Sequence, residues 1–169
     1  MSAVYNNFKD IDGKTAFLAG VVSTLADQTL CEIVPRYWAV EADVFEADRD
    51  NLESSVKERM RIYDSTESKL TEDLHFEIEE CTNDFEKIVH SLFDSYNEKH
   101  SNKESENIKY FLGGIYFQLG DIKAIYRLKK PLGEKCERCF SDYYTYIIFD
   151  IFFIQYSNYI VMVVFGSDE

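Results

Sequence analysis

The chain has 169 residues, of which 46% are hydrophobic, 15% are aromatic and only two are proline. This composition predicts a single folded domain and excludes a disordered tail. The formal net charge of −13 argues against a nucleic-acid ligand, because proteins that hold DNA or RNA neutralise phosphates with lysine and arginine. We expect a basic partner instead.

Hydrophobic periodicity predicts three helices within residues 14–100, the helical half of the chain. The first covers Lys14–Val34 and ends before Pro35, because a proline disfavours helical geometry in the residue before it. The second covers Asp43–Tyr63 and the third covers Thr71–Lys99. In the third, apolar residues recur at every third or fourth position: Leu70, Leu74, Ile78, Cys81, Phe85, Ile88, Leu92 and Tyr96.

Residues 108–166 are rich in aromatic and β-branched side chains and form the predicted sheet half. Ile108–Leu119 fits either a helix or a strand, because two adjacent glycines interrupt its helical spacing. Ile122–Leu128 is a predicted strand, and a loop is expected over Pro131–Glu137. The remaining apolar residues form two runs of strand formers, Tyr143–Gln155 and Tyr159–Phe165, which predict a hairpin. We therefore predict an α+β fold, with N-terminal helices packed on a C-terminal, mainly antiparallel β-sheet.

Neither apolar stretch that could interact with a membrane meets the criteria for a targeting or spanning segment. Thr15–Ala26 resembles a signal-peptide core, but Asp10 and Asp12 cancel the positive charge before it. Tyr143–Phe165 is long enough to cross a bilayer, but Asp150 lies near its middle. We expect a soluble, cytoplasmic protein with reduced cysteines and no membrane association.

Two short motifs raise the question of catalysis or metal binding. Cys136 and Cys139 form a CxxC pair without a second ligand pair, so two thiols in a loop are the simpler interpretation. A single ExxH motif suggests a carboxylate–histidine metalloenzyme, although di-iron bundles need two such motifs. Its ligands would be Glu72, His75, Glu86 and His90. Because no catalytic signature is complete, we predict a non-enzymatic protein without a metal or another cofactor.

The charge is strongly localised. Residues 41–86 hold 16 acidic and five basic side chains, which is −11 of the total −13. On the predicted third helix, Glu72, Glu79 and Glu80 lie opposite the apolar stripe, with Phe76 among them. Phe76 fits either packing beneath the predicted second helix or the N-terminal segment, or an anchor in a protein interface. The predicted partner-binding residues are Asp43, Glu46, Asp50, Glu72, Asp73, Phe76, Glu79 and Glu80.

The acidic segment 41–86 and the aromatic-rich terminal hairpin Tyr143–Phe165, which ends in Gly166-Ser-Asp-Glu169, together resemble a known class of protein. In size, charge and architecture the chain resembles the bacterial immunity proteins of polymorphic and contact-dependent growth-inhibition toxin systems. The resemblance implies a non-catalytic inhibitor that binds a cognate toxin domain, often a nuclease, and occludes its basic active site. An acidic DNA-mimic inhibitor or an adaptor would share the same surface.

Overall fold

The computed structural model describes residues 13, 16–17, 20, 38–47, 51–61, 64, 70–96, 108–109, 112–113, 116, 121–144 and 148–167. These residues form an α+β fold, as predicted. In chain order the elements are β1 (Trp38–Glu46), α2 (Leu52–Met60), the 3-10 turn η3 (Leu70–Asp73), β2 (Ile78–Glu80), α3 (Phe85–Tyr96), β3 (Ala124–Leu128), α5 (Glu134–Tyr144), β4 (Ile148–Gln155) and β5 (Tyr159–Ser167).

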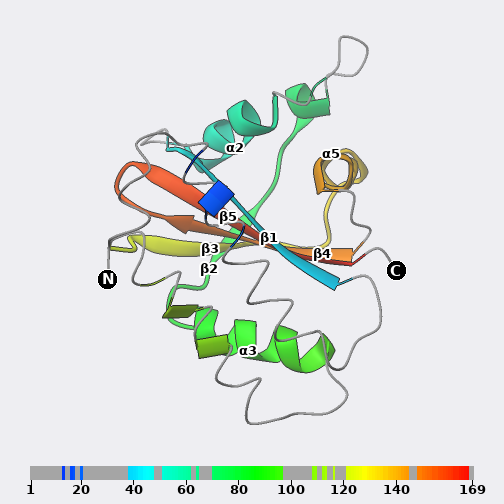
Figure 1. Cartoon of the computed structure of the whole chain (residues 1–169). Helices are drawn as coiled ribbons and strands as arrows, with labels where there is room; N and C mark the ends of the chain where they lie inside the picture. Colours follow the sequence, from blue (N-terminus) through cyan, green and yellow to red (C-terminus); the bar gives the residue numbers. More distant parts are fainter. Residues whose placement is uncertain are drawn as a thin grey trace.

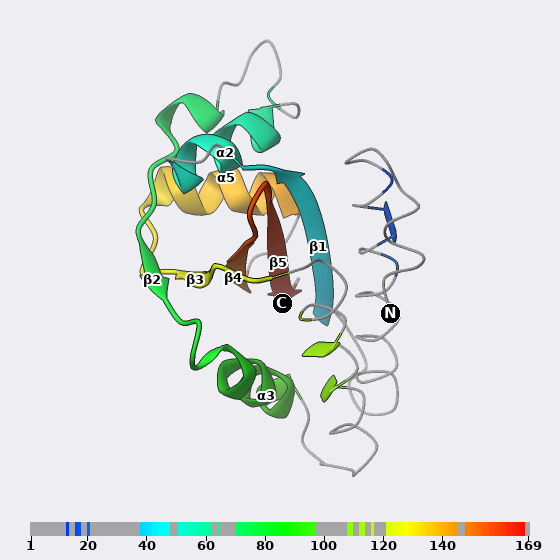
Figure 2. The same ribbon diagram turned by 90° about the vertical axis from the view of Figure 1, so that its left-hand side faces the viewer.

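The described strands form one five-stranded sheet in the order β1-β5-β4-β3-β2, and every neighbouring pair is antiparallel. The predicted terminal hairpin is confirmed: β4 pairs with β5 in a register that places Ile151 opposite Val164. β4 and β5 occupy the centre of the sheet, whereas β1 and β2 form its two edges. Figure 2 shows these edges on opposite margins of the sheet.

Helices cover both faces of the sheet. Figures 1 and 2 show α3 on one side and α2 with α5 on the other. Alternation along β4 and β5 divides their side chains between two cores, because successive residues of a strand point to opposite faces. Phe152 and Val163 belong to the core beneath α3, whereas Phe153 and Val164 belong to the core beneath α2 and α5.

The predicted helix over Asp43–Tyr63 is wrong in its first part, where the chain forms the end of strand β1. Val40, Ala42 and Val44 are buried on the α3 side of the sheet, so the polar residues between them reflect the two-residue period of a strand. The helix itself begins only at Leu52. There the side chain of Asn51 accepts a hydrogen bond from the Ser54 N–H at 3.2 Å and caps the first turn.

The predicted helix over Thr71–Lys99 is confirmed only in its later part, as α3, and is wrong in its first part, which forms η3 and β2. The hydroxyl of Thr71, the first residue of the predicted helix, donates to Asp64. Leu74 packs in the core beneath α2 and α5, whereas Phe85 packs in the core beneath α3. The segment therefore passes around the edge of the sheet, and the regular spacing of its apolar residues does not mark one helix face.

Three further predictions concern the remaining segments. Residues 134–137, predicted as a loop, open helix α5, which extends to Tyr144, so the following strand begins at Ile148 instead of Tyr143. The predicted strand over Ile122–Leu128 is confirmed as β3. The described positions within 108–119 are helical, as are the few described positions of the predicted first helix; the rest of that helix lies outside the described residues.

The sheet is thus not confined to the C-terminal half, because β1 and β2 come from the predicted helical half. The acidic residues of segment 41–86 therefore lie on edge strands, in turns and at helix ends, and not on the faces of two helices. Among the described residues, every helix is too short or too polar to cross a bilayer.

Candidate protein-binding edge

The predicted acidic residues do not form one surface. Glu46 ends β1 at one edge of the sheet, whereas Glu79 and Glu80 lie on β2 at the other edge. Glu72 is exposed in η3, Asp73 is the last residue of the same turn, and Asp50 lies outside the described residues. The structure therefore separates the predicted set into two edges and one turn.

Asp43 does not belong to an exposed acidic surface, contrary to prediction. It is only 5% exposed, and both of its oxygens accept hydrogen bonds from Arg59 of α2, at 2.7 and 2.9 Å. A buried charge is stable only when it is paired. Asp43 therefore anchors α2 to β1 and is not available to a partner.

The β2 edge carries two residues of the predicted set, Glu79 and Glu80, next to two further exposed carboxylates. Glu79 and Glu80 are exposed on β2, and Asp84 and Glu86 are exposed directly after it, at the start of α3. We call these four residues the acidic edge. Sequence reasoning missed Asp84 and Glu86 because it placed them within a continuous helix instead of at the turn that follows a strand.

The thiol of Cys81 reports the electrostatics of the acidic edge. Burial raises the pKa of this thiol to about 11, the nearby Arg127 opposes the rise, and Glu79, Asp84 and Glu80 add to it. These three carboxylates are therefore close enough to Cys81 to disfavour the negatively charged thiolate form of its side chain. The thiol stays protonated at neutral pH and is not a nucleophile.

Arg127 lies opposite Glu79 in the β2–β3 ladder, but its guanidinium is directed to the next strand. Its Nη2 and Nε donate to Asp150 Oδ1 at 2.7 and 3.1 Å. Asp150 is the residue that argued against a membrane span, and the structure gives it a partner within the sheet. Arg127, the residue opposite Glu79 in the ladder, is thus paired with Asp150 of β4.

Phe76 packs against the protein, as in the first of its two interpretations, but the rings that it meets belong to β4 and α5 and not to the predicted second helix or the N-terminal segment. Its ring stacks on Phe153 of β4 at a centroid distance of 5.5 Å and meets Phe140 of α5 edge-on at 5.8 Å. The side chain is half-buried and contributes to the core beneath α2 and α5. It holds the chain that leads into β2 against the sheet.

Glu53 of α2 holds the same segment from the other side. Its carboxylate contacts Lys57 at 3.1 Å and His75 Nδ1 at 3.0 Å, and it accepts the Phe76 N–H at 3.4 Å. Burial acts to raise the pKa of Glu53, but the hydrogen bonds from Lys57 and the Phe76 N–H outweigh it, and the net pKa is lowered. The position of β2 thus depends on contacts to α2 as well as on its pairing with β3.

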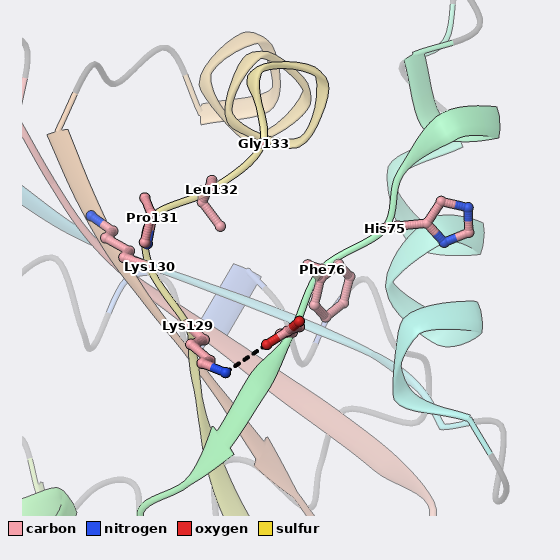
Figure 3. Close-up of a pocket in the computed structure, with 8 residues that line it drawn as sticks. His75, Phe76, Lys129, Lys130, Pro131, Leu132 and Gly133 are labelled. Carbon is pink, nitrogen blue, oxygen red and sulfur yellow. Dashed lines mark hydrogen bonds and ion pairs between the residues drawn. The ribbon is translucent and has the colours of Figure 1, made fainter.

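A hollow of about 330 Å³ lies at the point where the β2–β3 pairing ends. Residues 75–77 and 129–133 line it, and Phe76, Pro131 and Leu132 supply its apolar lining. Lys129 at its rim pairs with Glu77 at 2.6 Å (Figure 3). This salt bridge lowers the pKa of Glu77 and raises that of Lys129.

The four residues of the predicted metal site are not brought together. Glu72 and His75 lie in and just after η3, beside the core beneath α2 and α5, whereas Glu86 and His90 lie on α3, on the opposite face of the sheet. Within the described part of the chain, no group of three or more potential ligands could hold a metal ion. The metalloenzyme alternative therefore loses its geometric basis.

The CxxC pair lies on α5 instead of in the predicted loop. Cys136 and Cys139 are 4% and 3% exposed and face the core beneath α2 and α5. Burial, together with Cys139, raises the pKa of the Cys136 thiol to about 12. These thiols are core residues at helical spacing with Phe140, a pattern that the sequence contained and that predicts a helix.

No family model, curated protein or solved structure matches the chain. The function is therefore inferred from the arrangement of the described residues, and the inference rests on the acidic edge and the adjoining hollow.

Proposed function

We propose that this protein is a non-catalytic immunity protein that binds a cognate toxin domain, a nuclease, and occludes its basic active site. The observation that carries the proposal is the acidic edge: Glu79 and Glu80 are exposed on the edge strand β2, and Asp84 and Glu86 are exposed where the chain passes from β2 into α3. A nuclease holds its substrate phosphates with lysine and arginine. Such a site is complementary in charge to the acidic edge.

The proposed mechanism is stoichiometric occlusion. The carboxylates steer the toxin domain to the edge and then occupy the positions that the substrate phosphates would take. The segment that leads into the edge is anchored at two points, because Phe76 stacks on the central strand β4 and Glu53 contacts His75 and the Phe76 N–H from α2. A preorganised surface loses little conformational entropy on binding.

Genetic context provides the test of this function. An immunity gene should directly follow the gene of a secreted toxin, so the neighbouring toxin domain is co-produced with this chain. We expect a stable complex and growth of cells that the toxin domain alone would kill. A non-toxic neighbour, or a toxic one that neither binds nor is neutralised, would contradict the proposal.

Charge reversal tests the assignment of the surface. The double variant Glu79→Lys/Glu80→Lys should slow association at low salt by about tenfold or more, because charge steering governs the association rate. The matched control, Glu58→Lys/Glu137→Lys, makes the same change in net charge on α2 and α5. An equal loss in both variants would assign the effect to overall charge and not to the acidic edge.

A further inference from the structure

The backbone of β2 offers more than a support for carboxylates. The Cys81 N–H donates to Ile125 O at 2.8 Å, and the Lys129 N–H donates to Glu77 O at 2.9 Å. In an antiparallel ladder, hydrogen-bonded and non-hydrogen-bonded pairs alternate. With these two pairs bonded, the peptide groups of Ile78 and Glu80 point away from β3, toward the outside of the sheet.

Among the described strands β2 is an edge strand, and Figure 2 shows it at the margin of the sheet opposite β1. An edge strand can accept a further strand through its outward N–H and C=O groups. A second copy of this chain fits poorly, because antiparallel pairing of two β2 strands would bring Glu79 and Glu80 of one copy against those of the other. The occupant that the charge favours is a basic one.

From this geometry we infer that β2 binds its partner by strand addition: an extended segment of the partner pairs with the outward peptide groups of Ile78 and Glu80. The inference rests on the proposed function and specifies how the toxin domain is held. Side chains of Glu79 and Glu80 lie on opposite faces of the sheet, so the added strand carries two consecutive basic residues beside them.

The other end of the added strand has a different character. Beyond Ile78 the edge leads to the hollow, where Phe76, Pro131 and Leu132 supply apolar surface and two lysines, Lys129 and Lys130, stand at the rim. His75 is directed away from it, toward Glu53 on α2. The hollow therefore suits an uncharged apolar side chain, and the bound segment is basic at one end and apolar at the other.

Synthetic peptides test this inference without a known partner. The probe is the capped hexapeptide Thr-Leu-Val-Lys-Arg-Thr, with its reversed sequence to allow for either strand direction. Binding is followed by the amide chemical shifts of the full-length protein. We expect the largest shifts at Ile78 and Glu80, and loss of binding when Lys-Arg is replaced by Glu-Glu. Absence of binding by both basic sequences would overturn the inference.

Backbone methylation supplies the matched control. One version of the peptide is N-methylated at every second backbone nitrogen, and the other version is methylated at the remaining nitrogens. Because alternate N–H groups of a strand point to opposite edges, only one version loses the N–H groups that face β2. We expect that version to bind about tenfold more weakly, through the loss of its hydrogen bonds, while the other binds like the parent. Equal binding of both methylated peptides would show that the peptide binds through charge attraction without backbone hydrogen bonds, and would overturn strand addition.

A variant of the protein provides the complementary test. Ile78→Pro removes the outward N–H without removing a bond to β3, and proline is tolerated on edge strands in this orientation. Ile78→Val retains the N–H and serves as the control. We expect weaker peptide binding only in Ile78→Pro; unchanged binding in a folded variant would contradict the inference. If Ile78→Pro does not fold, the methylated peptides still decide.

The two proposals can fail separately. If the genetically linked toxin domain binds but Ile78 and Glu80 show no protection of their amides in the complex, the immunity function stands and strand addition fails. If the peptides bind as described but the neighbouring protein is neither toxic nor bound, β2 remains a strand-accepting edge and the immunity function fails.

Discussion

The centre of the sheet and its β2 edge differ in burial and in the contacts that stabilise them. At the centre, β4 and β5 are buried on both faces, and Phe152, Phe153, Val163 and Val164 are all completely inaccessible. At the edge, β2 has three residues, and two of them are exposed glutamates. The centre is stabilised by the burial of its own apolar side chains. The edge is stabilised by contacts of the segment before it, through the Phe76 ring on β4 and the hydrogen bond of the Phe76 N–H to Glu53.

This difference assigns separate roles to the two regions. A strand buried on both faces cannot contact a partner, so the centre contributes stability alone. An edge strand that is fixed by side contacts retains outward peptide groups and exposed charges. Substitutions in the centre should therefore change the free energy of unfolding, whereas substitutions at the edge should change binding with little effect on stability.

The largest expected effect comes from the centre. Phe152→Ala removes a side chain that meets Phe85 and Phe165 edge-on, at 5.2 and 5.7 Å. Loss of a fully buried phenylalanine costs about 3–5 kcal/mol. Phe76→Ala, in the half-buried segment beside the edge, should cost about 2 kcal/mol. Urea denaturation measures both values, and an equal or larger cost for Phe76→Ala would contradict the contrast between centre and edge.

The second effect compares the two edges of the sheet. At β1, the buried Asp43 forms a bidentate pair with the partly exposed Arg59, so Arg59→Met should reduce the free energy of unfolding by about 3 kcal/mol, because it leaves the buried carboxylate unpaired. Asp43→Leu/Arg59→Met should restore part of this loss. At β2, the Glu77–Lys129 pair is exposed, and Lys129→Met should have no measurable effect.

A comparable cost for Lys129→Met would show that the exposed pair stabilises the β2 edge. A negligible cost for Arg59→Met would mean that water reaches Asp43 and that α2 does not seal the β1 edge. Denaturation of both single variants and the double variant in the same buffer separates these outcomes, because the double variant measures coupling between the two β1 charges.

The same contrast explains which parts of the fold could be predicted from the sequence. The β4–β5 hairpin was predictable, because two long runs of strand formers separated by a short polar turn specify strands locally. The β2 segment was not, because Leu70, Leu74, Ile78, Cys81 and Phe85 also fit a helical period. The alternation of Leu74, Phe76 and Ile78 with His75, Glu77 and Glu79 was the signal for an extended segment.

The candidate site was predictable only in part, for the same reason. Local charge density identified Glu79 and Glu80, and the structure leaves both exposed. It also selected Asp43, because a carboxylate that is paired with Arg59 and one that faces water look alike in sequence. Pairing between residues 16 positions apart depends on tertiary structure, which neither charge counting nor periodicity contains.

A pH titration tests how Glu53 supports the edge. Because the pKa of Glu53 is lowered in the folded protein, its contribution is fully present above its ordinary pKa and is lost as the pH falls through the lowered value. Glu53→Gln should therefore reduce the free energy of unfolding near neutral pH, and the difference from the unmodified protein should shrink as the pH falls below the ordinary pKa of a glutamate. Chemical denaturation across this range measures the difference.

Glu58→Gln is the matched control, because Glu58 lies on the same helix with a side chain that is 77% exposed. It should change stability little at any pH. A difference between Glu53→Gln and the unmodified protein that persists undiminished at low pH would show that Glu53 acts through packing and not through its charge.

The smallest effect is kinetic and compares cysteines of the two regions. Cys81 lies where the chain leaves β2, whereas Cys136 lies on α5 within the core; burial raises the pKa of their thiols to about 11 and about 12. Neither thiol reacts appreciably while buried, so labelling reports local opening. The measurement uses mildly alkaline pH and a variant in which Cys31, which lies outside the described residues, is replaced by serine. Mass spectrometry should find that Cys81 is labelled at least about tenfold faster than Cys136, because an edge opens without unfolding the centre.

Labelling of both thiols at one common rate would mean that only global unfolding exposes them and that the edge is as stable as the centre. The contacts of Phe76 and Glu53 would then join β2 to the central sheet in a single cooperative unit.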